Sequence, residues 1–186
     1  MFKLVWAITG SGYLLKESID LMKEIQENYE IKLTVILSKE GAVVVKWYRQ
    51  WLYLNEVIEF VKIEKTPNNP WLAGPLQLGK YDLFIACPVS ANSVAKIVHG
   101  IADNLVTNCV AQAIKGGMTA YLLPSDQYEE PIKTTRPDGS ELILKIRDIE
   151  LNNVNKLKKM EGIKVISEFS NLKSIIEEQI KSKNET

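Results

Sequence analysis

The sequence lacks a net charge, and it lacks any apolar run long enough to cross a membrane. Lys and Arg together number 23, and Asp and Glu also number 23. A spanning helix needs about 20 consecutive apolar residues, and a nucleic-acid-binding protein usually carries an excess of basic side chains. We therefore expect neither a membrane-spanning protein nor one that binds nucleic acid.

Cysteine and histidine are scarce, with two cysteines and one histidine in 186 residues. Cys87 and Cys109 lie in apolar segments without a partner at metal-ligand spacing, so we expect buried structural thiols and no metal site. An iron–sulfur cluster takes four thiolates, so any such cluster must belong to a partner. The first residues show neither a charged leader nor a cleavage site for export, and we expect a cytoplasmic protein.

Short apolar segments alternate with amphipathic segments along the chain, which fits one domain, 1–186, with a frayed tail at 182–186. We expect loops at 66–79 and 128–139, the second ending in a turn at 136–139 across which the strand that follows is a candidate for hairpin pairing. We expect strands at 2–9, 32–37, 57–63, 82–87, 118–123, 141–147 and 163–166, and helices at 15–25, 41–53, from 91, from 103, and at 150–160 and 172–181. This alternation predicts an α/β fold: a three-layer, doubly wound (Rossmann-like or flavodoxin-like), mostly parallel sheet with helices on both faces.

A polar turn follows the apolar segment 82–87 and has the sequence Pro88-Val89-Ser90-Ala91-Asn92-Ser93. Apolar residues then recur at helical spacing, so the turn opens a helix, with Ser90 or Asn92 as its N-cap. A helix N-terminus presents free N–H groups and a partial positive charge. The turn is therefore a candidate phosphate-binding site.

A second turn, Thr9-Gly10-Ser11-Gly12, joins the first strand to the first helix, where doubly wound folds bind phosphates. It is not a dinucleotide fingerprint, because Leu15 occupies the third glycine position. A mononucleotide fits better, with the hydroxyls of the serines near the strand ends converging on one monophosphate. Those serines are Ser11, Ser38, Ser90 and Ser93. The alternative is that these residues are only turn and helix-cap residues of a fold without a cofactor.

Two segments carry a resemblance to a known family. The 88–93 turn and Asp103-Asn104-Leu105 resemble the Pro-Ala-Ser-Ala-Asn-Thr and Asp-Asn-Leu signatures of the homo-oligomeric flavin-containing cysteine decarboxylase superfamily. Over residues 3–165 the chain most resembles the archaeal-type archaeoflavoproteins (AfpA type), near relatives of dihydromethanopterin reductase. The resemblance implies FMN and a homo-oligomer. The predicted cofactor-binding residues are Thr9, Gly10, Ser11, Gly12, Ser38, Lys39, Pro88, Val89, Ser90, Ala91, Asn92, Ser93, Asp103, Asn104 and Leu105.

The groups that decarboxylases of this superfamily use are missing. No histidine precedes the strand at 82–87, and the histidine of this chain, His99, lies within the helix that follows the turn. Pro124-Ser125-Asp126-Gln127 stands where the decarboxylases have Pro-x-Met-Asn. We therefore predict an FMN-dependent oxidoreductase or electron-transfer flavoprotein without a catalytic side chain, and not a decarboxylase.

The resemblance implies that electrons come from a reduced iron–sulfur protein such as ferredoxin and pass to a pterin or flavoprotein acceptor. Two alternatives stay open: a pterin reductase of the dihydromethanopterin type, and a flavin-binding carrier without turnover. The resemblance also suggests that the 72–82 segment borders the flavin ring, with Gln77 or Lys80 beside it. The helix from Asp103 is apolar on nearly all sides, which favours a neighbouring subunit as its cover.

Overall fold

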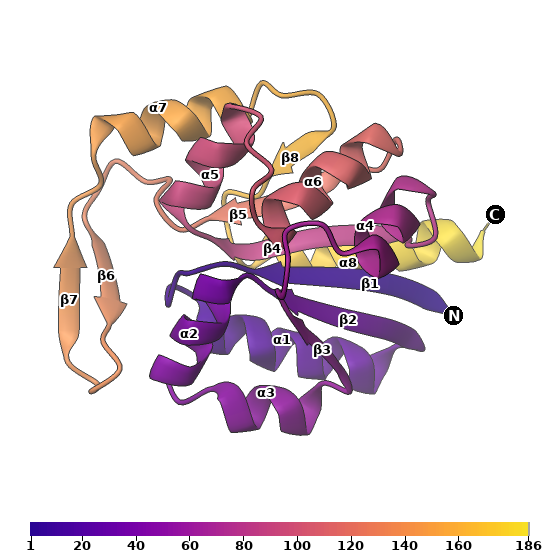
Figure 1. Cartoon of the computed structure of the whole chain (residues 1–186). Coiled ribbons are helices and arrows are strands. Elements are labelled where there is room, and N and C mark those ends of the chain that lie inside the picture. Colours follow the sequence, from indigo (N-terminus) through magenta and orange to yellow (C-terminus); the bar gives the residue numbers. More distant parts are fainter. Residues whose placement is uncertain (186) are drawn as a thin grey trace.

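The computed structural model describes residues 1–185 and contains a six-stranded parallel sheet with the strand order β3-β2-β1-β4-β5-β8 (Figure 1). The strands are β1 (Phe2–Ile8), β2 (Ile31–Leu37), β3 (Phe60–Ile63), β4 (Leu83–Val89), β5 (Ala120–Pro124) and β8 (Ile163–Val165). The order reverses between β1 and β4. The predicted doubly wound α/β fold is thus confirmed.

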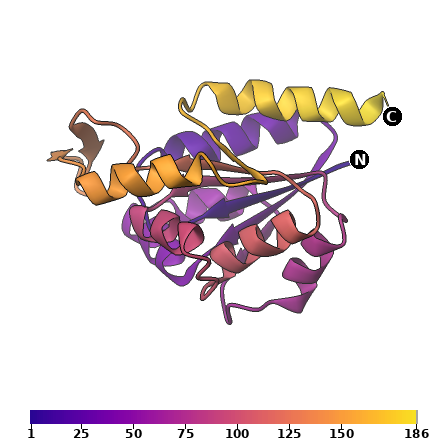
Figure 2. The ribbon, with the colours of Figure 1, turned by 90° about the horizontal axis from the view of Figure 1, so that it is seen from above.

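Helices cover both faces of this sheet, as the view from above shows (Figure 2). One face packs against α1 (Leu15–Asn28), α2 (Lys39–Trp47), α3 (Trp51–Val57) and α8 (Asn171–Asn184). The other face packs against α4 (Pro70–Gln77), α5 (Ala91–Val98), α6 (Leu105–Lys115) and α7 (Asp148–Leu157). The central strands are apolar along their length because both of their faces are buried.

A two-stranded antiparallel hairpin, β6 (Ile132–Thr135) and β7 (Glu141–Leu144), stands beside the main body at the left of Figure 1. The strand expected at 141–147 is therefore shorter, and it pairs across a turn with a segment that we expected to be part of a loop. Because the hairpin lies outside the main sheet, only one of its faces is turned toward the rest of the chain.

Two helical regions differ from the prediction. The single helix expected at 41–53 is two helices, separated at Arg49, whose φ of 57° lies in the left-handed region that ends a helix. The loop expected at 66–79 contains α4, because the Asn69 side chain accepts a hydrogen bond from the Trp71 N–H and proline is tolerated in the first helical turn. Leu72 and Leu76 of α4 are fully buried, so packing outweighs the prolines.

We expected residues 182–186 to be frayed, but α8 continues to Asn184. Lys183 Nζ donates to the Asp82 carboxylate at 2.7 Å and to the Met1 carbonyl at 3.2 Å, which ties the helix end to the sheet. Thr186 lies outside the described residues. Within residues 1–185, no helix has both the length and the apolar character of a membrane span.

Gly41 provides a test of how tightly α2 packs on β1. A Cβ atom at this position would lie 2.5 Å from the Ile8 carbonyl oxygen, which is backbone and cannot move aside cheaply. We expect Gly41→Ala to lower the free energy of unfolding by about 1–3 kcal/mol, as measured by urea denaturation. Gly74→Ala in α4 is the matched control, because nothing lies within 4 Å of a Cβ there. It should stabilise the protein by about 0.5–1 kcal/mol; equal effects of the two changes would contradict the prediction.

Candidate functional site

The site lies where the strand order reverses, at the carboxyl ends of β1 and β4. Thr9 joins the two turns there: its N–H and its hydroxyl both donate to the Pro88 carbonyl, at 3.2 and 3.1 Å, and its Oγ1 accepts from the Ser90 N–H at 2.7 Å. Ligands of doubly wound sheets bind in the crevice outside such a reversal. The geometry therefore brings together the two turns that the sequence singled out.

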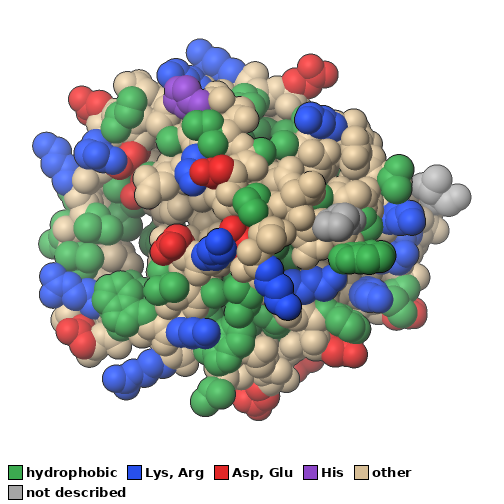
Figure 3. Space-filling model, viewed as in Figure 1, with side chains coloured by type: hydrophobic (Ala, Val, Ile, Leu, Met, Phe, Trp, Pro, Cys, Tyr) green, Lys and Arg blue, Asp and Glu red, His purple; other side chains and the backbone are tan. Residues whose placement is uncertain are grey.

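Two adjoining cavities open at this point, and Gly10, Ser90 and Asn92 line both. The first, which we call the hairpin cavity, has a volume of about 330 Å³, and a hollow is visible between the hairpin and the body in Figure 3. The second, the helix cavity, has a volume of about 670 Å³. The hairpin cavity is also lined by Ser11, Gly12, Tyr13, Tyr48, Ala91, Ser125, Asp126, Ile132, Thr134, Leu142, Leu144 and Glu150. The helix cavity is also lined by Ser38, Lys39, Glu40, Val44, Glu64, Ser93, Ala95, Lys96, Asp103 and Asn104.

The backbone around the hairpin cavity offers unused donors. Within residues 1–185, no hydrogen bond engages the N–H groups of Gly10, Gly12, Ala91 or Asn92. Ala91 and Asn92 are the first residues of α5, where the helix dipole adds positive character. Free N–H groups from two turns at one edge of the sheet are the donor set that a phosphate needs, so these residues fit a phosphate-bearing cofactor.

The four serines that we expected to meet at one phosphate are divided between the cavities. Ser11 lines the hairpin cavity, Ser38 and Ser93 line the helix cavity, and Ser90 lines both. Two of them also cap helices: Ser38 Oγ accepts from the Gly41 N–H at 2.9 Å, and Ser90 Oγ accepts from the Ser93 N–H at 3.4 Å. Capping and cavity lining thus occur in the same side chains.

The other predicted residues divide into those that line a cavity and those that support it. Asp103 and Asn104 line the helix cavity, although Asp103 is paired with Lys96 at 2.8 Å and Asn104 caps α6. Four of the predicted residues line neither cavity and are buried in the turns or the core. These are Thr9, Pro88, Val89 and Leu105.

The 72–82 segment, which we predicted to border a flavin ring, lines neither cavity of this chain. Gln77 ends α4 and lies against Gly116 at the end of α6, and Lys80 precedes the start of β4. Both residues are therefore at the amino edge of the sheet, whereas the cavities are at the carboxyl edge. The long polar segment suggested an active-site loop, but its prolines and asparagine start a packed helix instead.

Glu64 is a site residue that the sequence analysis missed. It directly follows β3, is only 7% exposed, and accepts hydrogen bonds from the N–H groups of Lys39 at 3.4 Å and Leu105 at 3.1 Å. Its carboxylate therefore occupies the N-termini of both α2 and α6. At α5, by contrast, the first two N–H groups, those of Ala91 and Asn92, have no acceptor among the described residues. The position of Glu64 at a strand's carboxyl end was the signal that could have found it.

Two tyrosines form a second group that lies outside the predicted cofactor-binding residues. Tyr48 lies so close to Gly12 that a Cβ on Gly12 would be 2.2 Å from its ring. Tyr13 is half-buried, and burial together with the neighbouring Tyr128 raises the pKa of its phenol. Tyr13 therefore stays protonated even well above neutral pH and is able to donate a hydrogen bond. Neither tyrosine belongs to a motif, so only the packing of α2 against the first turn brings them together.

The lining of the hairpin cavity contains two acidic residues and no Lys or Arg. The Arg147 guanidinium donates to Glu150 at 2.8 Å and holds the pKa of that carboxyl below its usual value. Asp126 accepts a hydrogen bond from the Ser125 hydroxyl at 2.5 Å. Among the described residues it forms no direct ion pair, although the Arg147 guanidinium is near enough to interact with it electrostatically. The cavity therefore suits a ligand that presents hydrogen-bond donors beside Asp126.

Cys87 and Cys109 are free and buried, and burial raises the pKa of each thiol to about 12. An unfolded thiol ionises near pH 9 while the folded thiol stays protonated, so stability should be lost as pH rises above about 9. We expect a loss of up to about 1.4 kcal/mol per thiol for each pH unit. Urea denaturation at pH 8 and pH 10.5 measures this, and the Cys87→Ala/Cys109→Ala variant should lose less over that interval. Parallel losses in the two proteins would contradict the prediction.

A six-stranded parallel sheet with free N–H donors at its reversal point defines an α/β nucleotide-binding protein. The chain matches the Flavoprotein family model over residues 1–185, and it belongs to that family. The predicted resemblance to flavin-binding proteins is thereby confirmed.

Relatives and solved structures refine this assignment. The chain is 40% identical over 185 residues to an uncharacterised protein of Methanocaldococcus jannaschii, with full coverage of both chains. It is 43% identical over 141 residues to the dihydromethanopterin reductase (acceptor) of the same organism, which covers 72% of this chain and 57% of the reductase.

Among solved structures, it resembles Burkholderia xenovorans DmrB in complex with FMN, described as a cubic protein cage for redox transfer. The TM-score is 0.81, with 29% identity and coverage of 98% and 97%. A dodecameric FMN-dependent UbiX-like decarboxylase of Escherichia coli O157:H7 shares the fold, with a TM-score of 0.65, 18% identity and coverage of 92% and 84%.

Proposed function

We propose that this protein binds FMN non-covalently and is a redox flavoprotein that takes electrons from a reduced iron–sulfur protein of the ferredoxin type and passes them to an acceptor. The observation that carries the proposal is the set of unused N–H donors at Gly10, Gly12, Ala91 and Asn92 in a member of the Flavoprotein family. The FMN complex of DmrB supports the choice of cofactor. By analogy with the cage and the dodecamer, we also propose a homo-oligomer.

The proposal of a homo-oligomer is based on the solved structures of similar proteins and not on the apolar character of α6. The apolar residues of α6 are buried within the chain by the sheet and by α4, which we had expected to be a loop. The apolar character of this helix therefore does not require a neighbouring subunit.

Each part of the site has a separate task in this proposal. The free N–H groups and the Ser11 and Ser90 hydroxyls would hold the phosphate, with each charge-assisted hydrogen bond contributing about 1.5–3 kcal/mol. Bound flavin would supply the electron or hydride chemistry. The inner face of the hairpin, with Ile132 and Leu142, would exclude water, and Tyr13 would remain a neutral donor.

The test begins with the purified protein and added FMN. Binding should quench or shift the flavin fluorescence at a stoichiometry of about one FMN per chain, because each chain has one reversal point. Reduced ferredoxin should then bleach the flavin absorbance band under anaerobic conditions. A protein that takes up no FMN would overturn the whole proposal, whereas uptake without bleaching would remove only the ferredoxin donor.

A second candidate function is favoured by the hairpin cavity, whose Asp126 and two tyrosines suit a planar heterocycle with N–H donors. A dihydropterin is such a molecule, and two reductases of the dihydromethanopterin type are relatives. In this case dihydropterin should reoxidise the reduced protein rapidly. Flavin that cycles without accelerated transfer to any acceptor would instead indicate a flavin carrier.

We also propose that the protein is not a decarboxylase. His99, the histidine of this chain, is exposed at the end of α5, where its Nδ1 lies 2.8 Å from the Ala95 carbonyl, and it lines neither cavity. Release of carbon dioxide from a peptide ending in cysteine, in the presence of FMN, would contradict this assignment.

A further inference from the structure

We propose that the exposed face of α2, together with the turn that follows it, is the docking surface for an iron–sulfur electron donor with an acidic face. This α2 surface consists of Val43, Lys46, Trp47 and Arg49. The proposal rests on the proposed redox function and names the part of the chain that would receive the donor.

The centre of the α2 surface is apolar and open to solvent. Val43 is 58% exposed and Trp47 is 64% exposed. The two residues are four positions apart in one helix, so their side chains lie on the same face. Exposed tryptophan is unusual because it leaves a large apolar ring in water, and tryptophan is enriched among residues that anchor protein interfaces. This apolar centre would be covered by the partner.

Basic side chains surround this centre. From residue 39 to residue 49 the chain has three basic residues, Lys39, Lys46 and Arg49, and one acidic residue, Glu40. Lys39 and Glu40 are neighbours at the start of α2, and both line the helix cavity. The positive excess beside Trp47 therefore comes from Lys46 and Arg49. Lys46 Nζ lies 5.1 Å from the centre of the Trp51 ring. Blue side chains accordingly stand around green ones over α2 at the lower left of Figure 3. Because the whole chain is neutral, this local excess is a property of the surface, and it complements an acidic partner.

The α2 surface is also directly connected to the site. The rings of Trp47 and Tyr48 meet edge to face, with centroids 5.9 Å apart and an interplanar angle of 78°. Tyr48 lies against Gly12 and lines the hairpin cavity. Trp47 and Tyr48 would therefore be the two side chains between a docked donor and the hairpin cavity. Each encounter would oxidise the donor cluster by one electron, and two encounters with two protons from water would reduce one flavin.

Another exposed tryptophan does not have these properties. Trp71 is 81% exposed at the start of α4, but that helix contains no charged residue, it packs against α6, and none of its residues lines either cavity. Trp71 thus provides a matched control for the aromatic residue. Lys156, in the last turn of α7, and Lys159, just after that helix, are exposed and provide a control for the charges.

The first experiment measures binding and does not depend on turnover. Oxidised [4Fe–4S] ferredoxin is titrated into the FMN-free chain by calorimetry at low and at moderate salt. We expect Lys46→Glu/Arg49→Glu to weaken binding about tenfold or more and to reduce its salt dependence. Trp47→Ser should weaken binding with the salt dependence retained. Trp71→Ser and Lys156→Glu/Lys159→Glu should bind as the unaltered protein does.

The second experiment separates this proposal from the proposed function. The variants are loaded with FMN, and flavin reduction by ferredoxin is compared with photochemical reduction by deazaflavin. If ferredoxin reduces the variants more slowly than the unaltered protein, while deazaflavin reduces both equally fast, the result would support the α2 surface as the docking site. If ferredoxin reduces the unaltered protein and the variants equally fast, the α2 surface is wrong while the redox function stands. If it fails to reduce even the unaltered FMN-loaded protein, the ferredoxin-donor part of the proposed function fails.

The native mass of each variant tests whether a second copy of this chain, and not an electron donor, binds the α2 surface. A second copy of this chain on the α2 surface would make Trp47→Ser or Lys46→Glu/Arg49→Glu change the oligomeric state. An altered mass would therefore overturn the donor surface in favour of a subunit contact. An unchanged mass together with weakened ferredoxin binding is the result that we expect.

Discussion

Asn92→Asp should lower the affinity for FMN about 100-fold, because it places a carboxylate at the point where the two cavities meet. Asn92 lines both cavities and is the second residue of α5, whose free N–H groups are the proposed phosphate donors. The new negative charge would occupy those donors and repel the phosphate dianion. Fluorescence titration of FMN measures the loss.

The same substitution should not destabilise the fold. A carboxylate in the first turn of a helix interacts favourably with the helix dipole, by about 0.3–1 kcal/mol. Asn171→Asp makes an equal charge change in the first turn of α8, away from both cavities, and should leave FMN affinity unchanged. Retained FMN affinity in Asn92→Asp would show that the phosphate binds elsewhere, whereas equal losses in both variants would indicate a nonspecific charge effect.

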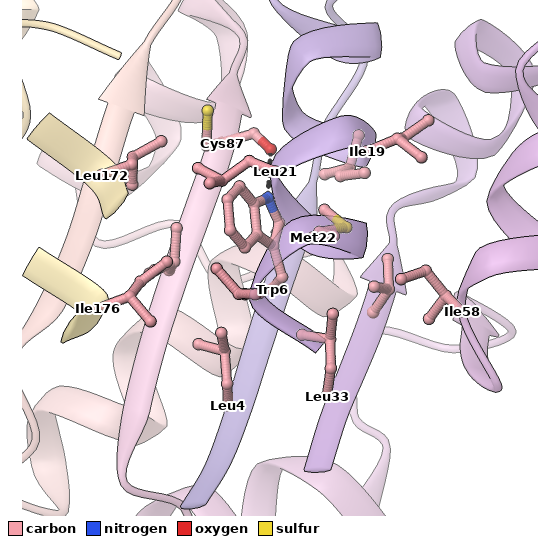
Figure 4. Close-up of a cluster of buried hydrophobic side chains, with 14 of the residues drawn as sticks. Leu4, Trp6, Ile19, Leu21, Met22, Leu33, Ile58, Cys87, Leu172 and Ile176 are labelled. Carbon is pink, nitrogen blue, oxygen red and sulfur yellow. Dashed lines mark hydrogen bonds between the residues drawn. The ribbon is translucent and has the colours of Figure 1, made fainter. Parts of the chain in front are cut away.

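Trp6→Ala should lower the free energy of unfolding by about 3–5 kcal/mol, which is a large share of the stability of a typical domain. Trp6 is fully buried in β1, and its indole Nε1–H donates to the Cys87 carbonyl at 2.7 Å (Figure 4). Around it, Leu4, Met22 and Leu172 show that β1, α1 and α8 meet at this ring. The substitution would leave a cavity and an unpaired carbonyl just before the phosphate turn.

Trp6→Phe distinguishes the contribution of the buried ring from that of its hydrogen bond to the Cys87 carbonyl. It keeps most of the apolar volume and removes the hydrogen bond, so we expect a smaller loss of about 1–3 kcal/mol, again from urea denaturation. FMN affinity should fall in Trp6→Phe only if the Cys87 carbonyl helps to hold the turn at Ser90. Identical stability of Trp6→Phe and the unaltered protein would show that the hydrogen bond contributes nothing.

The fold could be predicted because its main signals are local in the sequence. Apolar segments such as 82–87 are long enough for strands and too short for most helices, and each is followed by a polar turn. The errors arose where tertiary packing opposes local preference. The prolines of 66–79 suggested a loop, yet Leu72 and Leu76 gain enough from burial to hold α4. The left-handed backbone at Arg49 ends α2, although this position lacks the glycine that usually signals such a helix end in a sequence.

The sequence by itself determined the alternating elements, the two turns and the candidate phosphate residues, because each depends on neighbours within a few positions. Only the tertiary structure decided which side chains share a cavity. Glu64 and Asp126 follow β3 and β5, and they meet the turns because parallel strands bring their carboxyl ends to one edge of the sheet. Tyr48 follows α2, and it meets the first turn because that helix packs against it. The same packing places Ser11 in the hairpin cavity and Ser38 in the helix cavity. The spacing of these serines along the chain does not predict this separation.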